Sequence, residues 1–236
     1  FGVFVSTDHG KWWGQLKGGL PPIAIMDMEI QERENDLVLA TFGRGFSILD
    51  NYAPLRDATS EIYEKEVAIL PVKTAKLFQT RNPIGRGGNG NQGANYYQEP
   101  NPAFGASIFY WVKNSHESPK AIREKAEAEA IKTKGDFPLT DIETLRTEKQ
   151  YKGAYALISI KDAQGNEIRR LKGASGKGMQ KATWDLRHSD LRVLSNTAAN
   201  MPGFIVRPGT YTAEITIIEN AKKSSDRYKN LKARGK

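Results

Sequence analysis

The chain has 236 residues, of which 39% are apolar and 9% aromatic, and it carries a formal net charge of +8. This length and apolar content suffice for one large domain or two ordinary ones, and they exclude a chain that is disordered throughout. The sequence has no cysteine and no apolar run approaching the roughly 20 residues that span a bilayer, which excludes disulfides, thiolate metal sites and a membrane-spanning helix.

Residues 1–56 contain short apolar runs separated by polar or glycine-containing turns. The runs are GVFVS, IMDMEI, LVLATF and GFSILD, and the second follows the two prolines Pro21 and Pro22. Short strands at such regular spacing are typical of a β-meander, a sandwich or a propeller blade. We therefore predict an all-β segment here.

The turn after the first predicted strand reads STDHGKWW and can be either a chemical site or a structural turn. Ser6 and Asp8 can hydrogen-bond backbone groups of their own turn. Gly10 can adopt a positive φ, and Trp13 can fold back as an apolar plug. A nucleophile would need a histidine directed at Ser6, and a metal site would need clustered ligands, but the sequence shows neither pattern. The turn is therefore predicted to be structural, and no metal or cofactor is expected.

Residues 57–103 are predicted to form a connector. Within it, AILPVKTAKLF is compatible with a strand, whereas PIGRGGNGNQGAN holds five glycines and almost no apolar residue. A single RGG is a weak RNA-binding signature, and the segment lacks the acidic residues that glycine-rich calcium repeats need. We interpret the glycine-rich segment as a loop.

Residues 104–218 contain a second series of strands, which predicts a β-sandwich of immunoglobulin-like size. The strands are GASIFYWV, two runs within GAYALISIKDAQGNEIRRL, QKATWDLR and GTYTAEITII. The turn between the two middle runs falls at Gln164 to Asn166, as in a β-hairpin. Trp184 is the candidate for the centre of the core.

A polar insert, residues 114–150, interrupts this second series and is predicted to hold two helices. Ser118 and Pro119 stand as the N-cap and the first residue of the first helix. Thr140 and Glu143 have the spacing of a capping box at the start of a second, short helix. The apolar face of the insert is thin, which favours a solvated extension over a partner-binding helix.

Much of the positive charge lies in the tail, residues 219–236, which holds seven basic and two acidic residues. Such a tail is either solvated or a phosphate-binding arm. Because the excess charge is concentrated in one tail, we expect it to be solvated and expect no nucleic-acid partner.

The turn sequence STDHGKWW resembles the Asp-box, or BNR repeat, of sialidase-like and sortilin-like β-propellers, and Ser6, Asp8, Gly10 and Trp13 match that box. In that family the box is structural and joins the third and fourth strands of a blade on the side opposite the active face. The segments NDLVLATFGRGFSILDNYAPLR, PNPAFGASIFYWV, DAQGNEIRRL, WDLR and RPGTYTAEI are similar to the C-terminal part of large bacterial BNR-repeat, glycosyl-hydrolase-like proteins. The chain departs from that pattern at Phe42, where the family often has histidine, and in its basic tail.

The resemblance implies a mainly β chain: a partial β-propeller, comprising the last one to two blades, followed by an immunoglobulin-like β-sandwich with a helical insert. A propeller needs roughly four to eight blades to close its ring. Upstream blades of the same protein are therefore the expected partners. The implied location is secreted, periplasmic or at the cell surface.

Two classes of function are consistent with this resemblance. The first is a non-catalytic role in which the propeller binds a carbohydrate or protein ligand and the sandwich supports it. In the implied blade geometry, Asp27 and Arg44 lie toward the ligand face and are the candidate ligand-binding residues. Arg44 can instead form a structural bond to a neighbouring blade.

The alternative function is part of a sialidase-like or glucanase-like glycoside hydrolase, which needs two carboxylates flanking the glycosidic bond. The acids considered in this segment are Asp27, Glu29, Asp36 and Asp50. Ordinary strand and turn placement explains each of them, so the catalytic acids of such an enzyme would lie mostly upstream. We assign no catalytic residue here, favour a non-catalytic segment and leave open whether the parent protein is an enzyme.

Overall fold

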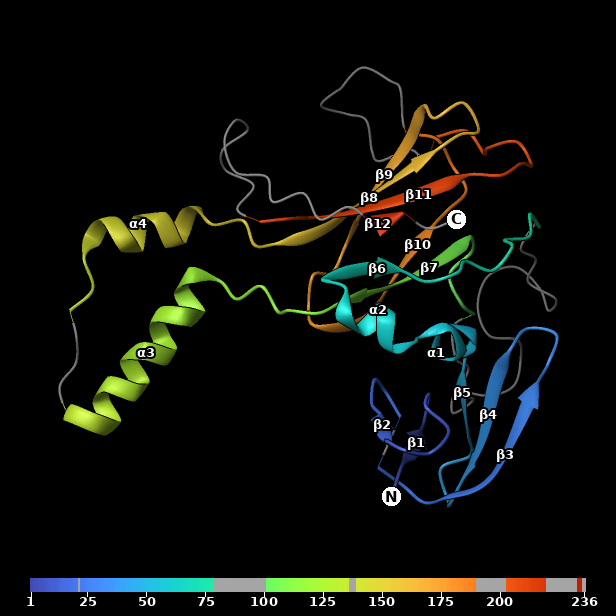
Figure 1. The fold of residues 1–236 in the computed structure, drawn as a ribbon, viewed down its shortest axis with the longest axis horizontal. Coiled ribbons are helices and arrows are strands. Elements are labelled where there is room, and N and C mark those ends of the chain that lie inside the picture. The colour runs from blue at the N-terminus through green and yellow to red at the C-terminus, as the bar shows by residue number, and fades with distance from the viewer. Residues whose placement is uncertain (21, 79–100, 136–138, 190–202, 220–232, 235–236) are drawn as a thin grey trace, which may run out of the picture.

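The computed structural model describes residues 1–20, 22–78, 101–135, 139–189, 203–219 and 233–234. Within these residues the chain is mainly β and forms small antiparallel sheets, none of which closes into a barrel or ring (Figure 1). This confirms the mainly β character that was predicted, whereas the division into propeller blades and an immunoglobulin-like domain stays a prediction. Among the described residues, no helix combines the length and apolar character needed to cross a membrane.

The N-terminal part forms two sheets. Strands β1 (Val3–Val5) and β2 (Gly14–Leu16) pair as a hairpin. Strands β3 (Ile25–Gln31), β4 (Asp36–Thr41) and β5 (Phe46–Leu49) form a meander in that order. The four apolar runs predicted as strands in this segment therefore all form strands.

Two short helices and one strand follow across the predicted boundary between the first segment and the connector. They are α1 (Ala53–Asp57), α2 (Ser60–Glu64) and β6 (Val67–Ile69). Strand β6 pairs with β7 (Ala106–Val112), which pairs on its other side with β10 (Gly178–Trp184). The connector range thus supplies an edge strand to a sheet of the second half. The glycine-rich segment, residues 83–95, lies outside the described residues.

The fourth sheet has the order β12-β11-β8-β9. Its strands are β8 (Tyr155–Lys161), β9 (Glu167–Gly173), β11 (Thr212–Ile218) and β12 (Ala233–Arg234). The predicted hairpin between β8 and β9 is confirmed: Asp162 N donates to Asn166 O at 3.0 Å, and Gly165 has a φ of 86°. Two residues of the tail form β12, and the described part of the tail is therefore paired with a sheet.

The main hydrophobic core lies between the β10-β7-β6 sheet and the β12-β11-β8-β9 sheet. Every second side chain of β7 and of β8 is buried, as expected for strands with one face on a core. Tyr110, Ile158 and Ile215 are fully buried in one cluster that both sheets share. Trp184 belongs to the same cluster, as predicted. These two sheets therefore pack together as one layered unit.

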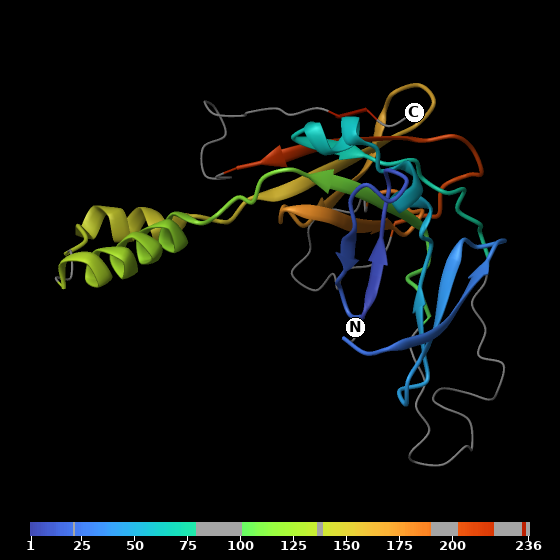
Figure 2. The same cartoon turned by 60° about the horizontal axis from the view of Figure 1, so that its bottom comes forward.

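The insert forms two helices, α3 (Pro119–Lys134) and α4 (Ile142–Gln150), which extend away from the sheets (Figures 1 and 2). The predicted cap of α3 is confirmed, because Ala121 N donates to Ser118 Oγ at 3.1 Å.

The predicted capping box of α4 is wrong. Asp141 is the N-cap, and its Oδ2 accepts from Glu143 N at 3.1 Å. The Thr140 hydroxyl donates instead to Glu127 Oε1 on α3 at 2.9 Å. The hydroxyl that the local spacing assigned to an N-cap thus bonds an acidic side chain on the other helix instead.

Candidate functional site

The turn between β1 and β2 is held together by its own side chains. The Ser6 hydroxyl donates to Asp8 Oδ1 at 2.8 Å, and the same carboxylate oxygen accepts from Trp12 N at 3.0 Å. Gly10 N donates to Ser6 Oγ at 2.7 Å, and Gly10 has a φ of 84°. The Ser6 hydroxyl and the Asp8 carboxylate, the groups considered as a possible nucleophile and metal ligand, are thus both used in closing the turn.

The electrostatics of Asp8 fit this structural role. The backbone N–H of Trp12, followed by the Ser6 hydroxyl, lowers the pKa of the Asp8 carboxyl below its usual value. Within the described part of the chain, no group of three or more His, Cys, Asp or Glu side chains is arranged to hold a metal ion. Asp8 therefore serves as a hydrogen-bond acceptor for its own turn.

The Trp13 ring folds back onto the turn, since a Cβ atom on Gly10 would stand 3.9 Å from its Nε1. It does not form a buried plug, because 59% of its surface is exposed. Trp12 is also exposed, at 67%, and its ring lies beside Gly14, where a Cβ atom would stand 2.7 Å from it. The β1-β2 sheet has two strands in the described chain, so it provides no further strand to cover the indole rings. Hydrogen bonds hold the turn, and the tryptophans remain on its surface.

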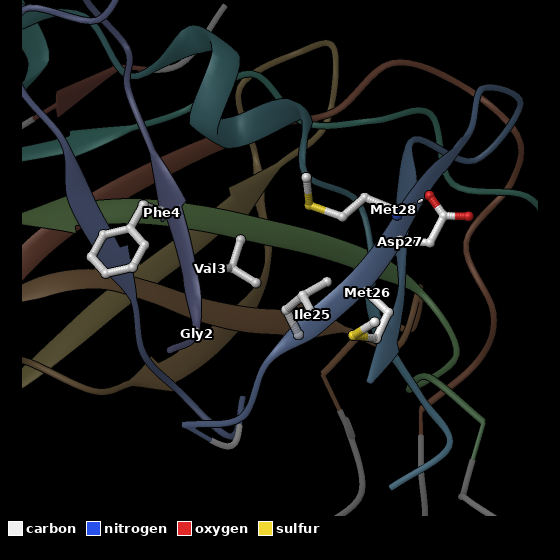
Figure 3. Close-up of a pocket in the computed structure, with 7 residues that line it drawn as sticks. All are labelled: Gly2, Val3, Phe4, Ile25, Met26, Asp27 and Met28. Carbon is white, nitrogen blue, oxygen red and sulfur yellow. Dashed lines mark hydrogen bonds between the residues drawn. The ribbon is translucent and has the colours of Figure 1, made fainter. Parts of the chain in front are cut away.

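A cavity of about 410 Å³ lies between β1 and β3, lined by residues 2–4 and 25–28 (Figure 3). Val3 and Ile25 point toward each other across it, whereas the Asp27 carboxylate points to the far side of β3. Ile25 and Asp27 are two residues apart and would share a side in a regular strand, but the register shift between them interrupts the alternation and turns Asp27 away. The side chains that line the cavity are mostly apolar, and the candidate acid faces away from its centre.

The two candidate ligand-binding residues lie at the same end of the β3-β4-β5 sheet. Asp27 follows a register shift in β3, and its Oδ1 accepts from Met28 N at 2.9 Å. Arg44 lies in the turn between β4 and β5, which is closed by Thr41 N donating to Gly45 O at 2.9 Å. In the described chain, Asp27 and Arg44 form no ion pair or hydrogen bond with each other. The two residues thus lie at one end of the sheet but do not contact each other through a polar bond.

The four acids considered for glycoside hydrolysis are divided between the two ends of this sheet. Asp27 lies near the start of β3, whereas Asp36 begins β4 at the opposite end. Asp36 Oδ1 accepts from Asn51 N at 2.9 Å. This bond ties the start of β4 to the chain just after β5, beside Asp50. Asp27 and Glu29 remain as two exposed acids on the same side of β3.

The β3-β4-β5 sheet carries apolar side chains on both faces. The register places Leu39 beside Met28 on one face and Val38 beside Ile48 on the other. Leu39 is fully buried, but Phe46 is 75% exposed and Ile48 59% exposed. Apolar side chains on both faces are typical of a sheet covered on both sides. Here Phe46 and Ile48 are exposed on the face that also carries Asp27 and Glu29, and Met28 and Ile30 are exposed on the face of Leu39.

An ionic cluster that the sequence patterns did not indicate links this sheet to the segment that follows β6. Glu34, in the turn between β3 and β4, binds Lys73 through its carboxylate, and its backbone O accepts from Lys73 Nζ at 3.0 Å. Lys76 adds a contact of 3.3 Å. These cations, Lys73 foremost, lower the pKa of Glu34. No local signal could have identified this cluster, because its members lie 39 and 42 residues apart.

Comparison of the chain with family models, curated proteins and solved structures finds no match.

Proposed function

We propose that this chain is a non-catalytic binding and scaffolding segment of a secreted or surface-located bacterial BNR-repeat protein. In this proposal the β3-β4-β5 sheet packs between other sheets of a propeller, and the exposed loops at the Asp27 and Arg44 end contact a glycan or protein ligand. The observation that carries the proposal is a sheet with exposed apolar side chains on both faces, Phe46 and Ile48 on one and Met28 and Ile30 on the other.

The chemistry of the acids supports binding over catalysis. Asp8 and Asp36 are engaged in holding turns. Asp27 has a carboxylate that points away from the cavity beside it. Glycoside hydrolysis requires two carboxylates fixed over a sugar-binding cleft, and of the described residues that line the cavity between β1 and β3, only Asp27 is acidic.

One observation favours the alternative, a contribution to a glycoside hydrolase. Asp27 and Glu29 are two residues apart on one strand, so their side chains leave the same side at a spacing of about 7 Å. That spacing falls within the range of paired catalytic carboxylates. Asp27→Asn therefore distinguishes the two functions.

The test uses the 236-residue chain on arrays of glycans and peptides, together with chromogenic sialoside and β-glucan substrates. We expect retention of a ligand, loss of that retention in Asp27→Asn and Arg44→Gln, and no hydrolysis above background. Asp50→Asn is the matched control and should bind as the unmodified chain does. Hydrolysis that disappears in Asp27→Asn would overturn the non-catalytic assignment, and retention unaffected by either substitution would overturn the assigned ligand face.

A further inference from the structure

A second cavity, of about 550 Å³, is lined by residues between 69 and 77 and by residues between 106 and 213. It opens between the two large sheets at the end where β6 and β10 finish and β11 begins. Leu70, Ile108, Ile160 and Trp184 line it, and all four are almost completely buried. The cavity therefore reaches down to the main hydrophobic core.

Aromatic residues form part of the wall, and their polar atoms are already bonded within the protein. The Trp184 and Tyr211 rings meet edge to face, with centroids 5.2 Å apart. Trp184 Nε1 donates to Arg187 O at 2.9 Å, and the Tyr211 hydroxyl donates to Arg207 O at 2.6 Å. The two rings therefore present apolar surface to a bound molecule, and their polar atoms need no hydrogen bond from it.

Two cations line the cavity, and they differ in their partners. Lys73 is paired with Glu34, as described above. Arg207 is exposed and makes no ion pair or side-chain hydrogen bond within the described part of the chain. None of the described residues that line the cavity is acidic. One uncompensated positive charge therefore stands beside a mostly apolar cavity.

We propose that this cavity binds a small amphipathic carboxylate, with its alkyl chain or ring against Ile108, Ile160 and Trp184 and its carboxylate at Arg207. The volume lies within the range typical of small-molecule sites, which are mainly apolar with few orienting polar groups. Removing the apolar part from water favours binding, and a guanidinium is suited to a carboxylate. Charge complementarity thus selects an anion over a neutral molecule of the same length.

Calorimetric titration of the 236-residue chain with octanoate and with octanol tests the proposal. We expect one octanoate per chain and weaker binding of octanol. Arg207→Gln should weaken octanoate binding about tenfold, the effect of losing one charged hydrogen bond, and leave octanol binding unchanged. Lys177→Gln removes an exposed cation at the other end of β10 and should change neither.

A filling substitution locates the bound molecule. Ala75 lines the cavity and packs against the core cluster, so Ala75→Phe should block both ligands while the folded circular dichroism spectrum is retained. If that variant does not fold, the titration of Arg207→Gln, a change at an exposed position, still tests the proposal. The proposal is overturned if octanoate does not bind, if Arg207→Gln and Lys177→Gln behave alike, or if folded Ala75→Phe binds as the unmodified chain does.

Discussion

Tyr110 shows how a single hydroxyl joins two sheets of this protein. The side chain is fully buried on β7, and its hydroxyl donates to Ala174 O, just beyond β9, at 2.7 Å. Burial raises the pKa of Tyr110 to about 12. Gly173 lies beside the same hydroxyl, and a Cβ atom there would stand 2.3 Å from the phenolic oxygen. Glycine at this position is thus required by packing.

We predict that Gly173→Ala destabilises the protein by roughly 1–3 kcal/mol, because the added methyl group forces the Tyr110 ring away from its hydrogen-bond acceptor. Urea unfolding monitored by circular dichroism measures the change. Gly176→Ala is the control, since a Cβ there would meet the side-chain nitrogen of Gln180 at 3.4 Å, which can move. Equal stability of the two variants would show that Tyr110 does not pack in this way.

Residues whose partners are near in sequence could be predicted from the sequence. Ser6 and Asp8 bond groups within four positions of themselves, so residue type and spacing indicated their structural role. The burial of Trp13 depends instead on what covers the turn, which the local pattern does not contain, and that prediction was wrong. Asp27 and Arg44 were placed through the resemblance, and their role as ligand contacts stays a prediction.

At the level of elements, alternation and turn chemistry predicted strands and one helix cap well. The cap at Ser118 and the hairpin at Gln164 to Asn166 formed where expected. The β3-β4-β5 sheet is the informative element, because its apolar residues differ in exposure. Leu39 is buried on one face, whereas Phe46 and Ile48 are open on the other. The cost of substitution should differ accordingly.

We predict that Phe46→Ser and Ile48→Ser each change the free energy of unfolding of the 236-residue chain by no more than about 0.5 kcal/mol, as expected for exposed positions. Leu39→Ala should cost about 2–5 kcal/mol, because it leaves a cavity in a buried position. Urea unfolding with light scattering on the same samples tests this difference. A cost at Phe46 or Ile48 similar to that at Leu39 would mean that this face is already covered in solution.

At the level of the whole molecule, the cluster around Glu34 connects the N-terminal sheet to the segment that follows β6. Lys73 belongs both to this link and to the wall of the larger cavity. Sequence patterns predicted the strands on either side, but not their connection, because an ion pair between distant residues leaves no periodic trace. The same limit applies to the larger cavity, whose walls come from five strands and two loops.

The pH dependence of this link follows from the lowered pKa of Glu34. A carboxyl whose pKa is lower in the folded protein than in the unfolded chain stabilises the fold above its usual pKa of 4.5, and this contribution is lost as the pH falls through the folded value. We predict that Glu34→Gln lowers the Tm at pH 7, and that the difference from the unmodified protein narrows as the pH is lowered below 4.5. Glu32→Gln, an exposed change in the same turn, should leave the Tm unchanged. A Tm difference for Glu34→Gln that stays constant from pH 7 down to pH 2 would rule out ionisation of Glu34 as the source of the stabilisation, and no difference at pH 7 would show that the link to Lys73 and Lys76 adds nothing to stability.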